Sequence, residues 1–199
     1  MNRGAVAQRR GVYPGTFNPP TVAHLAIADA ARQQLRLQRV DLVLSRRPIN
    51  KEHVDVPSFE DRLAVLEAVS ERIAWLEVMV TEATLIVDIA QGYDVVIMGA
   101  DKWEQVNDVR YYADEAARDD AVRRLPDIAL APRPLLAPPE DHPVTRGRVL
   151  ELPAHFGNVS SSAARAGQDL WMLPEAAEFD RLSGAWTDTE RYRRWSKSR

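Results

Sequence analysis

The chain has 199 residues, of which 45% are hydrophobic and 28% charged, which suits one domain with a buried core and excludes a disordered chain. Its formal net charge of −3 excludes a general attraction to nucleic acid or anionic membranes, so any phosphate site has to be local. The absence of cysteine excludes disulfides, thiolate catalysis and thiolate zinc sites, and it suits a reducing compartment.

No apolar run approaches the ~18 residues of a membrane span, and the first ten residues lack the apolar stretch of a secretory signal. We therefore expect a cytoplasmic protein without nucleic-acid or membrane partners. Whether it forms a homo-oligomer stays open.

Short apolar segments alternate with helical patterns along the chain. Strands are predicted at residues 10–14, 39–45, 75–80, 94–98 and 127–131, with a last short one at 148–152. Helices are predicted at residues 22–36, 58–72, 82–91, 112–124, 160–167, 174–183 and 187–197. This order predicts an α/β fold: a Rossmann-like open parallel sheet of about five strands with helices on both faces. We expect a single domain over residues 1–199, with residues 160–199 as a small C-terminal helical part packed on it.

Two further local patterns concern the start of a helix and a connecting loop. The helix at 58–72 begins at Ser58, and Asp61 three residues later makes a pattern close to a capping box. Residues 132–147 contain five prolines and predict a surface loop.

The stretch GTFNPPTVAH (residues 15–24) directly follows the first predicted strand, at the edge where open parallel sheets bind ligands. Gly15 allows a close turn with exposed amides, and such amides, with the N-terminus of the next helix, can hold a phosphate. Thr21 and His24 are three residues apart and share one face of the first helical turn. The alternative is an ordinary strand–helix turn capped by Thr21, with His24 half buried.

The second stretch, NVSSSAAR (residues 158–165), begins a helix with three hydroxyls and places an arginine one turn later. Hydroxyls and free amides at a helix N-terminus beside a guanidinium can bind an anion. The alternative is an N-cap with additional serines.

Together the two stretches resemble the opening and closing signatures of the nucleotidylyltransferase superfamily, G-T/S-F-D/N-P…H/T-x-G-H and I-S-S-T-x-x-R. His24 matches the second histidine of the opening signature. Thr21 stands at the first, as in the pantetheine-phosphate adenylyltransferase branch, and Ala23 replaces the usual glycine.

Further segments resemble the nicotinate-mononucleotide adenylyltransferase branch, so that the likeness runs from about residue 11 to about 180. They are residues 47–51, 59–63, 81–85 (T-x-x-T-L), 98–103 (G-x-D), 131–134 and 173–175. Met79 and Val80 replace a Ser-Tyr pair of that branch, and residues 109–112 replace its W-H-x-W. Since both segments contact the pyridine ring in that family, the nucleotide-transfer machinery is better matched than the acceptor site.

The resemblance implies a set of roles. Amides of Gly15, Thr16 and Phe17 would cradle the triphosphate of ATP, and His24, Thr21 and Lys51 would act on the phosphates. Ser160, Ser161, Ser162 and Arg165 would hold the β- and γ-phosphates, while Gly99 and Asp101 would face the nucleoside. The acceptor would meet Thr81, Thr84, Trp103 and Arg133. Mg²⁺ would bridge phosphate oxygens and keep mostly water ligands, without a protein metal site. Trp103 could either stack on a heterocycle or pack in the core.

The implied function is transfer of AMP from ATP to nicotinate or nicotinamide mononucleotide in NAD biosynthesis, with release of pyrophosphate. One alternative is adenylyl or cytidylyl transfer to another phosphorylated acceptor, such as 4′-phosphopantetheine. The other is a nucleotide-binding paralogue with weak or no turnover. A hydride-transferring Rossmann enzyme is disfavoured, because no G-x-G-x-x-G follows the first strand.

Overall fold

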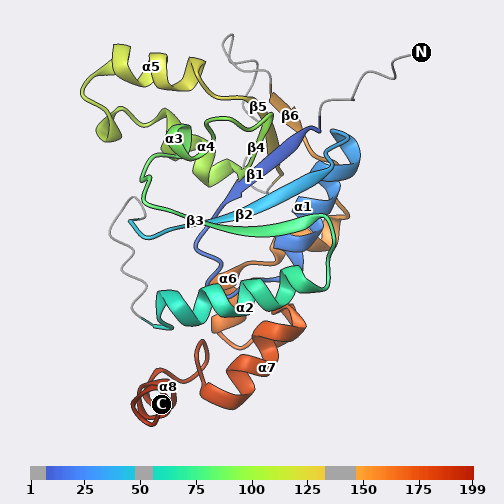
Figure 1. The fold of residues 1–199 in the computed structure, drawn as a ribbon, viewed down its shortest axis with the longest axis vertical. Coiled ribbons are helices and arrows are strands. Elements are labelled where there is room, and N and C mark those ends of the chain that lie inside the picture. The colour runs from blue at the N-terminus through green and yellow to red at the C-terminus, as the bar shows by residue number, and fades with distance from the viewer. Residues whose placement is uncertain (1–7, 48–55, 133–146) are drawn as a thin grey trace.

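The computed structural model describes residues 8–47, 56–132 and 147–199 (Figure 1). One sheet is formed by β1 (Arg10–Pro14), β2 (Arg39–Ser45), β3 (Leu76–Thr81), β4 (Val95–Gly99), β5 (Asp127–Ala131) and β6 (Gly147–Val149). The helices are α1 (Val22–Gln34), α2 (Phe59–Glu71), α3 (Ile86–Ile89), α4 (Ala100–Asn107), α5 (Glu115–Arg123), α6 (Ser161–Arg165), α7 (Pro174–Ser183) and α8 (Thr189–Lys197). None of the helices in these ranges is both long and apolar enough to cross a membrane.

The six strands all pair in parallel, in the spatial order β3-β2-β1-β4-β5-β6. The predicted Rossmann-like α/β fold is therefore confirmed, and the sixth strand is the short one expected near residue 148. Strand order reverses between β1 and β4, so the loops that follow these two strands diverge. Open parallel sheets bind their ligands at such a point.

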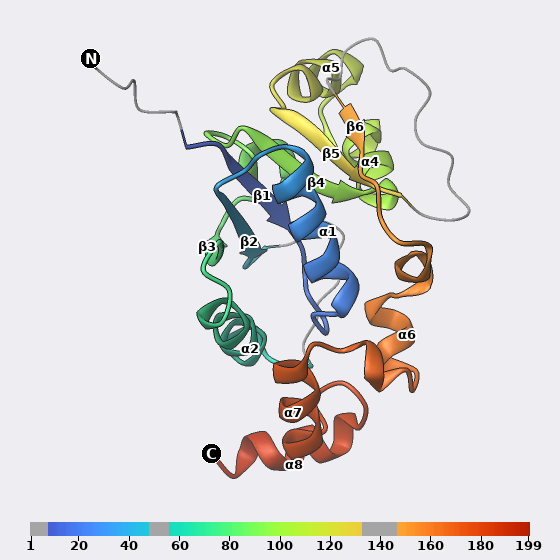
Figure 2. The same ribbon diagram turned by 90° about the vertical axis from the view of Figure 1, so that its right-hand side faces the viewer.

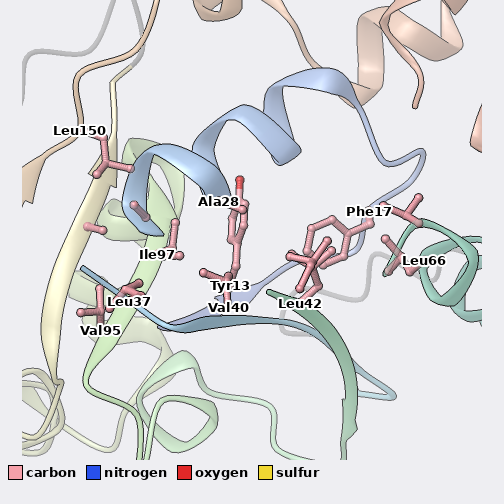
Figure 3. Packing of buried hydrophobic residues seen from close by; sticks show 14 of the residues in the cluster. Tyr13, Phe17, Ala28, Leu37, Val40, Leu42, Leu66, Val95, Ile97 and Leu150 are labelled. Carbon is pink, nitrogen blue, oxygen red and sulfur yellow. The ribbon is translucent and has the colours of Figure 1, made fainter. Parts of the chain in front are cut away.

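Helices cover both faces of the sheet (Figure 1). On one face, α1 and α2 pack against strand residues such as Val40, Leu42 and Ile97. Figure 3 shows Phe17, from the loop after β1, pointing into this core toward Leu42 and Leu66. On the other face, α3, α4 and α5 pack against alternate residues of the same strands. The strands are buried on both sides, which explains their nearly continuous apolar sequences.

Two elements differ from the sequence prediction. The helix expected at 82–91 is reduced to α3, because residues 82–85 form a turn in which the Thr81 hydroxyl accepts from Ala83 N at 3.1 Å. Helix α4 is not predicted, since most of its residues are polar and only Ala100, Trp103 and Val106 are buried. Their three-residue spacing is the signal that indicates the helix.

The C-terminal helices α6, α7 and α8 gather at the end of the molecule beyond α2 (Figure 2). A third apolar cluster joins them to α2 through Val65, and Arg72 of α2 pairs with Glu175 of α7 at 2.6 Å. Tyr192 of α8 also enters the cap of α2: its hydroxyl accepts from Ser58 N at 2.8 Å and donates to Asp61 at 2.5 Å. Asp61 N donates to the Ser58 hydroxyl, as the predicted capping box requires. The reciprocal contact, from Ser58 N to the Asp61 carboxylate, is made indirectly through the Tyr192 hydroxyl.

Asp41 is a fully buried carboxylate on β2, remote from the loop that follows β1. It pairs with Arg39 at 2.5 Å and accepts a hydrogen bond from the Tyr93 hydroxyl at 2.7 Å. Burial, together with the hydrogen bond to Asp41, raises the pKa of Tyr93 to about 12. This network links the amino-terminal half of β2 to the turn that precedes β4.

We expect Asp41→Ala to lower the free energy of unfolding by about 2–3 kcal/mol, the scale of hydrogen bonds to charged groups. Glu77→Ala is the matched control, because Glu77 also pairs with Arg39 at 2.6 Å but is half exposed. It should cost less than about 1 kcal/mol. Urea denaturation measures both losses, and equal losses would contradict this description of the network.

Candidate active site

The main cavity lies at the carboxyl ends of β1, β4 and β5 and has a volume of about 720 Å³. Its wall combines the loop after β1 with the start of α1, the end of β4, the start of α4, and residues 156–162. The two stretches that carry the sequence signatures therefore meet in one cavity, although they are about 140 positions apart (the Ser161–Pro19 contact spans 142).

Most carbonyl groups of the β1–α1 loop (residues 15–20) are bound by donors from other parts of the chain. The contacts are Arg62 Nη1 to Thr16 O at 2.9 Å, Arg165 Nη1 to Asn18 O, Ser161 Oγ to Pro19 O at 2.8 Å, and Leu173 N to Pro20 O at 3.0 Å. The donors come from α2, α6 and the segment before α7. The loop is thus held in place by α2, which packs on one face of the sheet, and by α6 and the segment before α7 in the C-terminal part.

The amide groups of the loop are left for a ligand. Among the described residues, no hydrogen bond is made by the amides of Thr16, Phe17 or Asn18. Phe17 adopts a left-handed conformation, with φ 45°, which turns successive amides to one side as in an anion-binding nest. The Gly15 amide, which was expected to bind phosphate as well, instead donates to Val43 O at 3.1 Å and extends the sheet.

Gly15 and Phe17 depend on each other sterically. A methyl group at Gly15 would lie 2.9 Å from Cζ of the Phe17 ring, which is 1% exposed. The ring packs edge-on against Tyr13 and His24, with centroids 5.7 and 5.2 Å away. Only glycine at position 15 lets the ring that anchors the loop sit in the core.

His24 is oriented by Thr21. Its Nδ1 accepts from the Thr21 amide at 2.9 Å and lies 2.8 Å from the Thr21 hydroxyl. Because a backbone amide can only donate, Nδ1 carries no proton, and the ring proton is on Nε2. His24 lines the main cavity. Thr21, expected to donate directly to phosphate, is 1% exposed and has its hydroxyl beside the imidazole.

The remaining predicted nucleotide contacts divide into two groups. Gly99, Asp101, Ser160, Ser161 and Ser162 line the main cavity. Ser160 also caps α6 by accepting from Ala163 N at 3.1 Å. Arg165 does not line the cavity, because its guanidinium is bound to Asn18 O and to the Ser162 hydroxyl at 3.3 Å. Lys51 and Arg133 lie outside the described residues.

A side cavity of about 70 Å³ adjoins the main one, and both share Gly15, Thr16, Lys102 and Tyr111 in their walls. Apolar and aromatic side chains dominate its lining, with Leu85, Ile86, Ile89, Val106 and Tyr112 among them. Thr84 lines it as predicted for the acceptor, whereas Thr81 does not. Trp103 is 6% exposed and lines neither cavity, so of the two alternatives for this residue the core packing is observed.

Arg62 forms part of the side cavity wall. It is 7% exposed, and burial lowers the pKa of its guanidinium. Its Nε has no hydrogen-bond partner within the described part of the chain, and its Nη1 supports Thr16 O. In these same ranges, no three histidine or acidic side chains are grouped so that they could hold a metal ion.

A family model described as cytidylyltransferase-like matches residues 12–167, which is most of the chain. The chain belongs to the cytidylyltransferase-like family. The matched region contains both signature stretches and nearly every residue that lines the two cavities.

Two relatives carry the name "Probable nicotinate-nucleotide adenylyltransferase". The one from Listeria welshimeri is 36% identical over 72 residues, or 36% of this chain and 38% of the relative. The one from Geobacillus kaustophilus is 39% identical over 57 residues, or 29% of this chain and 26% of the relative. The matched stretches thus span about a third of these relatives' length.

Two solved structures share the fold. They are Plasmodium falciparum nicotinic acid mononucleotide adenylyltransferase complexed with APC and the same enzyme complexed with NaAD, with TM-scores of 0.62 and 0.64 and identities of 15% and 14%. Each comparison covers 90% of this chain and 97% of the other.

Four contributors to this cytidylyltransferase-like site were not predicted from the sequence. Arg62 and Lys102 fall in matched segments without a predicted role, and Tyr111 and Tyr112 lie in the segment that replaces the W-H-x-W of the related branch. Their aromatic character at that position is the signal that indicates a cavity wall.

We expect Gly15→Ala to cost about 1–3 kcal/mol of stability, the scale of overpacking a core, because the new methyl group displaces the Phe17 ring. The same variant should weaken binding of inorganic pyrophosphate, since the ring anchors the loop amides. Gly147→Ala is the control, because a methyl group there meets nothing within 4 Å. Thermal unfolding and calorimetric titration provide the two readouts, and unchanged pyrophosphate affinity in a folded Gly15→Ala protein would refute the coupling.

Proposed function

We propose that the protein is an adenylyltransferase that transfers AMP from ATP to nicotinate or nicotinamide mononucleotide and releases pyrophosphate. The observation that carries the proposal is the pair of cavities that share residues of the β1–α1 loop in their walls. The larger one offers unpaired amides and a histidine proton donor, as a triphosphate requires. The smaller one offers an apolar and aromatic enclosure, as a flat ring requires. Donor and acceptor would meet at the loop.

The reaction needs positioning and charge stabilisation more than covalent catalysis. A phosphate oxygen of the acceptor attacks the α-phosphorus of ATP, and the bond from that phosphorus to the β-phosphate oxygen breaks. Amides of Thr16 and Phe17 hold the phosphates. The Nε2 proton of His24 donates to the oxygens on which negative charge develops. Lys102, whose Nζ is 2.9 Å from Gln105 Oε1, lines both cavities and adds a positive charge.

The other contacts follow from the lining of the main cavity. Asp101 is suited to accept hydrogen bonds from ribose hydroxyls, beside Gly99. The Ser160 and Ser162 hydroxyls offer donors to the outer phosphates, and Ser161, whose hydroxyl donates to Pro19 O, offers its backbone amide. We assign Lys51 to the phosphates and Arg133 to the acceptor, on the resemblance alone.

Mg²⁺ fits this site as a partner of the nucleotide. The described residues offer no cage of protein ligands, so the ion would be held by phosphate oxygens and water. When bound, it would neutralise charge on the departing pyrophosphate.

The names of the relatives support nicotinate mononucleotide as the acceptor. Purified protein with ATP and Mg²⁺ should release pyrophosphate with this mononucleotide or its amide, and not with 4′-phosphopantetheine. Release only with 4′-phosphopantetheine would support the other branch. Binding of ATP without turnover of any acceptor would overturn the enzyme proposal and favour a nucleotide-binding paralogue.

His24→Ala should lower kcat by roughly 10²–10³-fold, the scale for removing one donor to developing charge. The affinity for ATP should change much less, because the loop amides remain. Gln33→Ala, near the end of the same helix, is the control and should leave the rate unchanged. If the His24→Ala rate matches wild type, the histidine has no part in the transfer.

A further inference from the structure

We propose that Trp186 is a positioning residue for the β1–α1 loop and acts on it through the side chain of Asn18. The indole Nε1 donates to Asn18 Oδ1 at 2.6 Å, across 168 positions of the chain. Trp186 is 6% exposed and Asn18 8%, so water cannot replace either partner. The inference rests on the proposed function, since it gives a residue outside both cavities an effect on ATP binding.

The indole of Trp186 is fixed by contacts that do not involve the loop. Asp180, at the end of α7, accepts from Trp186 N at 2.6 Å, from Thr187 N at 3.0 Å and from the Thr187 hydroxyl at 2.6 Å. The Phe179 ring packs edge-on against the indole, with centroids 5.9 Å apart. A side chain fixed in this way can impose a position on its partner instead of adapting to it.

Asn18 links the fixed indole to the site. Its carbonyl group accepts a hydrogen bond from Arg165 and its side chain accepts one from Trp186, so it is held at two points. The indole N–H can only donate, so it fixes which end of the Asn18 amide faces it. Asn18 adjoins Phe17, whose amide makes no hydrogen bond among the described residues, and it lies three residues before Thr21 and six before His24. A shift of Asn18 therefore moves the amides and the histidine relative to each other.

Trp186 lines neither cavity, so its effect on a substrate has to pass through the loop. Leu173, just before α7, also binds the loop, but it does so through its backbone amide, which no side-chain substitution removes. Trp186 is the side chain by which the turn after α7 contacts the loop. Because of this hydrogen bond, we expect the C-terminal helices to influence the affinity of the site for ATP.

Trp186→Phe tests this directly, because it keeps an aromatic ring in the cluster and removes only the N–H donor. We expect the Kd for ATP, and the KM for ATP in the transfer assay, to rise roughly tenfold, as for a buried acceptor left without its donor. Trp195→Phe is the matched control: Trp195 packs against Phe179 and Tyr192 in the same cluster, with centroids 5.3 and 5.9 Å away. It should leave ATP affinity within twofold of wild type.

A measurement on the unmodified protein tests the proposal even if the Trp186→Phe variant fails to fold. Coupling between two sites is reciprocal, so ATP should slow hydrogen exchange at the Trp186 indole N–H by the same factor of roughly ten. Exchange at the Trp195 indole should not change. An ATP-independent Trp186 exchange rate, or equal weakening of ATP binding by both phenylalanine variants, would overturn the proposal. Failure of wild-type protein to bind ATP at all would instead overturn the proposed function.

Discussion

The site depends on the donors, from distant parts of the chain, that bind the backbone carbonyl groups of the β1–α1 loop. Each backbone carbonyl from Asn18 to Pro20, and that of Thr16, is satisfied by a donor from outside the loop. Among the described residues the amides of Thr16, Phe17 and Asn18 make no hydrogen bond, so they are available to an anion even in a chain with a net charge of −3. The positive φ of Phe17, and the absence of a side chain at Gly15 two residues earlier, make this geometry compatible with a buried aromatic anchor.

This constraint explains why remote parts of the fold belong to the site. The donors come from α2, α6, the segment before α7 and the turn after it, which are the elements that also build the third apolar cluster. Packing in that cluster and geometry in the loop are therefore linked. Arg165 and Ser161, expected to bind phosphate, donate in this structure to backbone carbonyl groups of the β1–α1 loop.

Much of the fold could be predicted from the sequence, because buried parallel strands are short and apolar and their order is restricted. Helix α4 was not predicted, because its three buried residues stand among polar ones and give only a weak apolar periodicity. The position of the site followed from the two signature stretches. The direction of other side chains did not: Trp103 faces the core, and the indole of Trp186 meets a loop 168 positions away. Such choices are made by tertiary contacts that no local pattern encodes.

The most direct test of this account is the NMR response of the loop amides to ligands. The account predicts that the amide protons of Thr16 and Phe17 move downfield with ATP and with inorganic pyrophosphate, because both place phosphate oxygens against them. Adenosine, which lacks phosphate, should leave them in place. Resonances that stay unchanged while ATP is bound, or that move equally with adenosine, would contradict the account.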